Sequence, residues 1–228
     1  MKRGKKYRAL AASYNIKAFF GVEDALNILK KSEYKFDQTV EIHFNLGVDP
    51  KHADQMVRGS VAMPHGTGKK IRILALCKDN LIQAATDAGA DFAGGADFVQ
   101  KISEGWLDFD AVVATPDMMA ILGKVAKVLG PRGLMPSPKA GTVSPNIAQV
   151  IKELKAGKIQ YRVDKGANVH APVGKLSFTN DQLRENVLAV IDSVRKNKPS
   201  TSKGIYIKSL TLAATMTPSV RIDLAVAR

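Results

Sequence analysis

The pattern that most constrains this fold is a two-residue alternation of apolar and polar side chains near both ends of the chain. Every second residue is apolar from Thr39 to Leu46, and again from Ser219 to Val226. Such alternation predicts strands with one buried and one solvent-facing side. Thr179 and Gln182 form a capping box before apolar residues at helical spacing, which predicts an amphipathic helix. The outer parts of the chain are therefore expected to mix strands with amphipathic helices.

The middle of the chain follows a different pattern, in which short apolar strands alternate with helical segments. The strands are expected at 71–77 and 111–114, and the helices at 81–88, 118–129 and around 147–156. This order is typical of βαβ units in an α/β domain. The stretch from Gly130 to Gly141 combines proline with glycine and predicts a loop.

Charge divides the chain at the same places as periodicity. Residues 1–69 and 160–228 together hold 23 basic and 12 acidic residues, a net charge of +11, whereas residues 70–159 hold 11 and 9, a net charge of +2. The simplest arrangement is one basic domain formed from both chain ends, residues 1–67 and 160–228, with a nearly neutral α/β domain inserted at 68–159. Gly66 to Gly68 and Gly157 would then flank a two-strand hinge.

The chain as a whole has a net charge of +13 and a pI near 9.8. This excess favours a polyanion as partner over solubility alone, for which a domain usually carries about 2 to 8 net charges. Cys77 is the only cysteine, so no intrachain disulfide can form, and we expect a buried thiol in a reducing compartment. Asn15 and Lys17 interrupt the segment after the basic start, and no apolar run reaches membrane-spanning length. We therefore expect a soluble, cytoplasmic protein without a signal peptide.

The sequence signatures of enzymes are incomplete. The segment His65-Gly-Thr-Gly-Lys-Lys70 has Met63 and Lys70 where a phosphate-binding loop needs glycine and a hydroxyl residue. Dinucleotide glycine spacing is missing, and the 4 histidines lack the spacing of metal ligands. Asp108 and Asp110 flank the start of a strand and are expected to be solvated. We predict no catalytic residue, no metal and no cofactor; an α/β enzyme using the middle domain and a DNA-binding regulator using the basic domain stay as alternatives.

Folded RNA is the favoured partner. Hydroxyl and charged side chains on the polar faces of the outer strands can meet 2′-hydroxyls and phosphates, through which paired RNA is recognised by shape. An ordinary solvated sheet face fits the periodicity equally well. Aromatic residues make up only 6% of the chain and no RNP1-like pattern occurs, so recognition by stacking on single-stranded bases is disfavoured.

A series of motifs is spread in order over nearly the whole chain. These are Phe36-Asp-Gln-Thr-Val-Glu41, Leu46-Gly-Val-Asp-Pro50, Val57-Arg-Gly59, Met63-Pro-His-Gly66, Gly105-Trp-Leu-Asp-Phe-Asp110, Thr115-Pro-Asp117, Gly130-Pro-Arg-Gly133, Pro138-Lys-Ala-Gly-Thr142, His170-Ala-Pro172 and Thr215-Met216. Together they closely resemble the bacterial ribosomal protein L-one family, the universal stalk proteins of the large subunit.

The resemblance implies an α/β fold made of a split two-layer α+β RNA-binding domain with an inserted Rossmann-like domain, joined by a hinge. It also implies a structural role. Family members bind a helical junction of large-subunit ribosomal RNA, form the mobile stalk beside the exit site and help deacylated tRNA leave. In bacteria they also repress translation of their own operon mRNA. The implied partners are ribosomal RNA, exit-site tRNA and this mRNA, with the protein a monomer within the ribosome and no membrane involved.

The resemblance further implies a set of RNA contacts, carried over by matching motif. They are Lys35, Phe36, Thr39, Glu41, Asp164, Lys165, Lys175, Ser177, Thr215, Met216, Thr217, Ser219 and Arg221. Glu41 can accept hydrogen bonds from 2′-hydroxyls or base amino groups. Two interpretations of the loop 130–141 stay open: Arg132 and Lys139 contact RNA, or the loop is a rigid cap.

The chain departs from the family pattern in two places. Thr217 stands where the family usually has glycine, which adds a β-carbon where RNA approaches closely. Lys165-Gly-Ala167 replaces the common Lys-Thr-Gly, so that turn is expected to differ locally.

Overall fold

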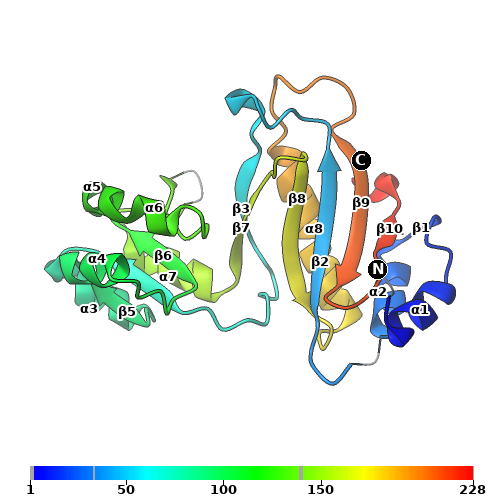
Figure 1. Cartoon of the computed structure of the whole chain (residues 1–228), viewed down its shortest axis with the longest axis horizontal. Helices are drawn as coiled ribbons and strands as arrows, with labels where there is room; N and C mark the ends of the chain where they lie inside the picture. Colours follow the sequence, from blue (N-terminus) through cyan, green and yellow to red (C-terminus); the bar gives the residue numbers. More distant parts are fainter. Residues whose placement is uncertain (1–2, 33, 139–140, 228) are drawn as a thin grey trace. The chain divides into compact units, whose positions relative to one another are not determined.

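The computed structural model describes residues 3–32, 34–138 and 141–227. The chain forms two compact units, one from residues 1–68 and 159–228 (unit 1) and one from residues 69–158 (unit 2), whose elements are labelled in Figure 1. Gly68 and Gly157, next to the two unit boundaries, have positive φ angles of 71° and 103°, a conformation that favours glycine. Lys139, a candidate RNA contact, lies outside the described residues, as do Met1 and Lys2 at the basic start.

Unit 1 is built on a five-stranded sheet with the order β1-β10-β9-β2-β8 (Figure 1). The strands are β1 (Phe19–Phe20), β2 (Thr39–Leu46), β8 (Asn168–Lys175), β9 (Ile207–Ala214) and β10 (Val220–Ile222). β2 pairs antiparallel with β8 on one side and β9 on the other. Its bounds are those predicted from the alternation, with the apolar residues buried and the polar ones partly exposed. The sheet is thus formed by strands from both the N-terminal and the C-terminal segments of the chain.

Two helices cover one face of this sheet. α2 (Val22–Lys30) and α8 (Asn180–Lys196) pack on each other and on the strands, which leaves the opposite face open (Figure 1). The predicted capping box is confirmed: Thr179 Oγ1 accepts from the Gln182 N–H, and the Gln182 side chain accepts from the Thr179 N–H. The unit also contains α1 (Lys5–Ala12), the 3-10 turn η1 (Ala53–Gln55) and the paired strands β3 (Arg58–Ala62) and β7 (Lys158–Arg162).

The prediction of a strand from Ser219 to Val226 is wrong at its C-terminal end. β10 ends at Ile222, and a 3-10 turn, η5 (Leu224–Ala227), follows. Asp223 explains the change, because its Oδ1 accepts from the Ala225 N–H at 2.9 Å and so caps the turn. A short polar side chain that bonds to nearby backbone competes with strand pairing, although the alternation of residue types continues.

Unit 2 contains a three-stranded parallel sheet with the order β5-β4-β6. Its strands are β4 (Ile73–Leu76), β5 (Phe92–Gly94) and β6 (Ala111–Ala114), and its main helices are α3 (Asp79–Asp87), α4 (Ala96–Ser103) and α7 (Ile147–Lys155). Separate apolar clusters lie on the two faces of the sheet, which is the predicted α/β arrangement. Cys77 directly follows β4 and is buried, as expected.

The single helix expected at 118–129 is wrong. The segment is broken into η2 (Pro116–Met118), α5 (Met119–Leu122), η3 (Gly123–Val125) and α6 (Ala126–Leu129). Gly123 lies at the break, and glycine is among the poorest residues in a helix interior. No helix in the described part of the chain is long and apolar enough to cross a membrane.

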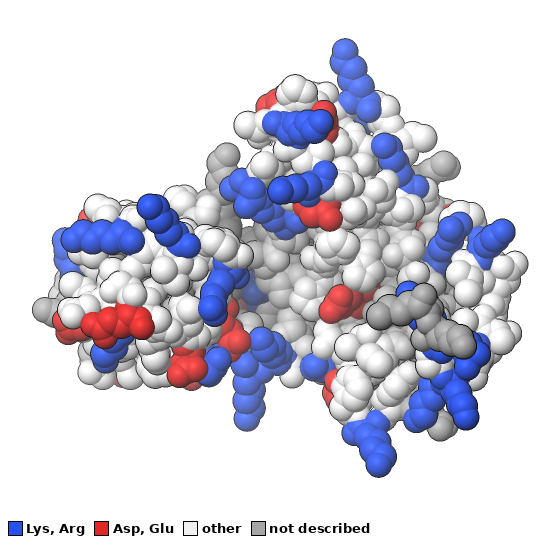
Figure 2. All heavy atoms as spheres, in the orientation of Figure 1, with Lys and Arg blue, Asp and Glu red and all other residues white. Residues whose placement is uncertain are grey.

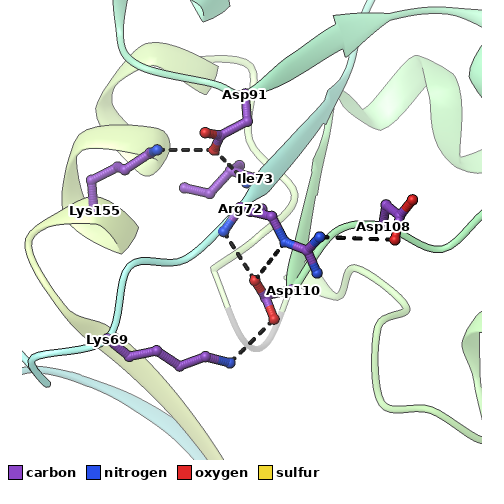
Figure 3. A network of polar contacts seen from close by, with 7 residues as sticks. All are labelled: Lys69, Arg72, Ile73, Asp91, Asp108, Asp110 and Lys155. Atoms are coloured by element: carbon purple, nitrogen blue, oxygen red, sulfur yellow. Dashed lines mark hydrogen bonds and ion pairs between the residues drawn. The ribbon is translucent and has the colours of Figure 1, made fainter.

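A network of ion pairs fixes the start of unit 2 against its sheet (Figure 3). Asp110 accepts from Lys69 Nζ at 3.1 Å, from the Arg72 N–H at 3.1 Å and from Arg72 Nε at 3.2 Å. Nearby, Asp91 accepts from the Ile73 N–H and from Lys155 Nζ, each at 2.9 Å. The expectation that Asp108 and Asp110 are both solvated is therefore wrong for Asp110, whose side chain is 25% exposed, against 75% for Asp108.

Candidate nucleic-acid interface

The open face of the unit 1 sheet carries side chains in rows across its strands, because paired residues in neighbouring strands share a face. The central row contains, from one sheet edge to the other, Phe19, Arg221, Thr211, His43 and His170. Glu41 and Asn45 lie in the flanking rows on β2. The sheet therefore brings two of the predicted contacts, Glu41 and Arg221, onto one face. The two histidines of this row were not predicted as part of a binding surface.

At one end of this face, Thr39 at the start of β2 bonds through its hydroxyl to Lys175 at the end of β8 and through its backbone to Thr215, which follows β9. The Thr39 Oγ1 accepts from Lys175 Nζ at 2.8 Å. The Thr39 N–H donates to Thr215 Oγ1 at 3.1 Å, and the Thr215 N–H donates back to the Thr39 carbonyl at 3.1 Å. β2 starts where β8 and β9 end, since both run antiparallel to it. Three residues that are far apart in the sequence are thus joined by hydrogen bonds.

Ser177 extends this end of the sheet. Its Oγ donates to Asp37 Oδ2 at 2.7 Å, and its N–H donates to Asp37 Oδ1 at 3.2 Å. Lys35 and Phe36 precede Asp37 and are exposed, Phe36 by 51%. We call Thr39, Lys175, Ser177, Thr215 and Met216 the strand-end cluster.

Gln38, a buried residue next to Thr39, supports the strand-end cluster through a hydrogen bond to Met216. It was not among the predicted site residues. It is only 1% exposed. Its Oε1 accepts from the Met216 N–H at 3.0 Å, and its Nε2 donates to Ser32 Oγ at 2.9 Å. The sequence carried one usable signal: Gln38 is polar, although the alternation places position 38 on the buried side of the strand. A buried polar residue in such a register needs hydrogen-bond partners, so its neighbours are fixed with it.

Asp164 and Lys165 lie at the other end of β8, away from the strand-end cluster. The Asp164 carboxylate accepts from the Asn168 N–H at 2.7 Å and the Gly166 N–H at 2.8 Å. The Asn168 N–H is the main cause that lowers the pKa of Asp164. Its carboxylate therefore shapes the turn before β8, while Lys165 stays exposed. Ala167 in this turn, where the sequence departs from the family, has a positive φ of 62°.

Thr217 differs from the other predicted contacts because its side chain is turned inward. It is 9% exposed, and its Oγ1 accepts from the Ala214 N–H at 2.8 Å and donates to the Ala214 carbonyl at 3.2 Å. This hydroxyl closes the turn after β9. Ser219 is exposed, and its carbonyl accepts from the Tyr14 hydroxyl at 3.3 Å.

The chemistry that the surface offers is binding. Figure 2 shows lysine and arginine side chains mainly around the margins of unit 1, with few charges over the middle of its face. No group of three or more histidine, cysteine, aspartate or glutamate residues in the described part of the chain could hold a metal ion. Fixed hydroxyls, one ammonium group and a largely neutral centre can donate to and accept from sugars and phosphates.

Comparison with known proteins identifies related sequences. Residues 28–218 match the model of the Ribosomal protein L1p/L10e family. The chain is also 54% identical over 226 residues to a protein of Solibacter usitatus (strain Ellin6076) named large ribosomal subunit protein uL1. That alignment covers 98% of this chain and 95% of the relative.

Proposed function

Since the chain belongs to the Ribosomal protein L1p/L10e family, we propose that unit 1 binds folded large-subunit ribosomal RNA through the strand-end cluster and the open sheet face. At the coarser level, a member of this family is a structural protein of the large ribosomal subunit and not an enzyme. It resides in the cytoplasmic ribosome.

The observation that carries the proposal is the convergence of Thr39, Lys175 and Thr215. Hydrogen bonds of 2.8 Å and 3.1 Å hold these side chains before any ligand arrives. Little side-chain entropy is then left to lose on binding. Fixed hydroxyls and an ammonium group suit 2′-hydroxyls and phosphate oxygens, by which paired RNA is recognised through its shape. Such a surface fits rigid, folded RNA better than a flexible strand.

The charge distribution supports the same unit. Unit 1, residues 1–68 and 159–228, holds 22 basic and 12 acidic residues, a net charge of +10, against 12 basic and 9 acidic residues, a net charge of +3, in residues 69–158. Positive charge attracts RNA from a distance and contributes affinity through the release of counterions. The Rossmann-like unit 2 is therefore expected to contribute little to the affinity for ribosomal RNA.

We further propose, from the resemblance to bacterial stalk proteins, a more specific role. The bound site would be a helical junction, the protein would form the mobile stalk as a monomer beside the exit site, and it would assist release of deacylated tRNA. It would also repress translation of its own operon mRNA. If that mRNA folds like the ribosomal site, one RNA surface serves both, and repression needs no second site.

The test replaces Thr215 and Met216 with alanine in the full chain and measures binding to a large-subunit ribosomal RNA fragment with a helical junction. We expect at least about tenfold weaker binding, since one hydrogen-bonding group and one exposed contact are lost. Thr215→Ser retains the hydroxyl that accepts from Thr39 and should bind like the unchanged protein. Ile205→Ala removes an apolar side chain that is 73% exposed, in the segment before the start of β9, and should also have no effect.

Unaltered affinity in the double variant would remove the pair from the binding surface. Equal affinity for duplex DNA of the same sequence would favour a DNA-binding regulator instead, because DNA lacks the 2′-hydroxyl.

A further inference from the structure

A pocket of about 290 Å³ lies beside the strand-end cluster. Its volume is just below the roughly 300–1,000 Å³ that is usual for small-molecule sites. α1 forms one wall with Tyr7 and Leu10, the segment after α2 forms another with Ser32 and Tyr34, and Met216 completes it. Met216 therefore belongs both to the pocket and to the proposed RNA-binding cluster.

The walls of the pocket combine aromatic rings with cations. Tyr7 and Tyr34 are both partly exposed. Lys6 Nζ lies 5.1 Å from the ring centroid of Tyr34, and the Arg3 guanidinium lies 4.8 Å from that of Tyr7. None of the described lining residues is acidic, and Lys31 adds a further ammonium group. Aromatic faces stack on nucleobases, and neighbouring cations attract the phosphates attached to them.

Two hydroxyls give the pocket hydrogen-bonding capacity of both kinds. Ser32 Oγ accepts from Gln38 Nε2 at 2.9 Å, so its own hydrogen can be donated to a ligand. Ser13 Oγ donates to the Leu10 carbonyl at 2.8 Å, so its lone pairs can accept. One donor and one acceptor beside aromatic walls match the edge and the faces of a base.

Gln38 links the pocket wall to the strand-end cluster through hydrogen bonds. Its side chain joins Ser32, in the pocket wall, to the backbone of Met216. We propose that this pocket receives one unpaired base, turned out of the RNA that the strand-end cluster holds. The proposal rests on the proposed function, because the bound RNA supplies the base.

A base fits the pocket better than a phosphate alone, since aromatic and apolar side chains form much of the lining. Unpaired bases in loops and bulges are bound in this way, splayed out and stacked on aromatic rings. The low aromatic content of the chain disfavoured stacking as a general mode of binding. The fold nevertheless brings Tyr7 and Tyr34 to one place.

The experiment probes base reactivity at nucleotide resolution in the same ribosomal RNA fragment, free and bound to the full chain. One unpaired nucleotide should be protected by the unchanged protein. Tyr34→Ala should remove the protection of that one nucleotide and of no other. It should also weaken binding of the RNA fragment roughly 5- to 100-fold. Tyr34→Phe retains the ring and should restore both properties. Ala9→Leu fills the pocket from an exposed helical position and should mimic Tyr34→Ala, even if the alanine variant folds poorly.

An abasic substitution at the protected nucleotide supplies the decisive control. It should weaken RNA binding as much as Tyr34→Ala does. The two changes together should lower the affinity no more than either change alone. Additive effects, or a footprint that is unchanged by Tyr34→Ala and Ala9→Leu, would overturn the pocket proposal while RNA binding stands. If the unchanged protein does not bind the fragment, the proposed function fails and the pocket proposal falls with it.

Discussion

His43 Nδ1 lies 2.8 Å from His170 Nδ1 across the paired strands β2 and β8, at the centre of the open sheet face. At this distance one nitrogen must carry the hydrogen and the other must accept it, so the pair cannot be doubly protonated without losing the bond. The outer nitrogens face carboxylates: His43 Nε2 is 4.0 Å from Glu41, and His170 Nε2 is 3.6 Å from Asp164.

This pair predicts a dependence of stability on pH. Burial lowers the pKa of His43, His170 lowers it further, and Glu41 opposes the shift. Because the folded pKa lies below the unfolded value of about 6.5, the unfolded state binds more protons in this range. The free energy of unfolding should therefore fall as pH drops from about 6.5 toward the folded pKa. Urea unfolding from pH 8 to 5 measures this effect. His43→Asn should flatten the profile, because it removes the group whose pKa is lowered in the folded state.

Asp110→Asn should destabilise unit 2 by about 1–2 kcal/mol, because the carboxylate accepts three hydrogen bonds, two of them from cationic side chains. The Arg72 N–H is the largest cause of the lowered pKa of Asp110. The stability that the ionised Asp110 carboxylate contributes is present above the unfolded pKa of about 3.9 and is lost as pH falls through the folded pKa. Asp108→Asn is the matched control, since that carboxylate has one ion pair, at 3.8 Å, and should change stability by less than about 0.5 kcal/mol. Equal losses in chemical denaturation would contradict the assigned role of Asp110.

Thr217→Gly should lower stability by about 1–2 kcal/mol, because it removes the hydroxyl bonded to Ala214 and adds backbone freedom. Thr217→Ser retains the hydroxyl and should lose little. RNA affinity should be maintained in both variants once they are folded, since the side chain is turned inward. A clear loss of affinity in the glycine variant at unchanged stability would show that the threonine contacts RNA directly.

Ala167→Gly should raise stability by roughly 0.5–1 kcal/mol. Its φ of 62° lies in the left-handed region, which costs an L-residue about 1–2 kcal/mol, and greater freedom of the unfolded chain offsets part of the gain. Thermal unfolding of the two proteins measures the difference. Gly166→Ala, in the same turn, should be destabilising instead, because a β-carbon there would lie 2.9 Å from Asn168 Nδ2, and hydrogen bonds with Asn45 and Asp164 hold the Asn168 side chain in place.

A shortened chain that joins residues 1–67 to 160–228 through a glycine linker should fold, since the unit 1 cluster of buried residues contains none from unit 2. It should bind junction RNA with nearly the salt dependence of the whole protein, because that slope follows the number of phosphates neutralised. Filter binding at several salt concentrations tests this. If most of the slope instead followed residues 68–159, the assignment of RNA binding to unit 1 would be wrong.

The sequence by itself determined the local elements where one residue pattern dominated. The alternation gave the bounds of β2, and Thr179 and Gln182 marked the start of α8, because period and capping are properties of neighbouring residues. The sequence patterns predicted elements that were too long in two places. A hydrogen bond of the Asp223 side chain to the backbone ends the last strand early, and Gly123, a weak helix former, interrupts the predicted helix.

Only the tertiary structure decided which of these residues meet. Thr39, Lys175 and Thr215 come together because β8 and β9 both run antiparallel to β2, a pairing that no local pattern specifies. The same pairing separates Asp164 from the cluster and joins His43 to His170. Contacts between strands more than 100 residues apart depend on the register of the whole sheet. The hydrogen bonds of the buried Gln38 side chain help to fix that register at the proposed RNA-binding end.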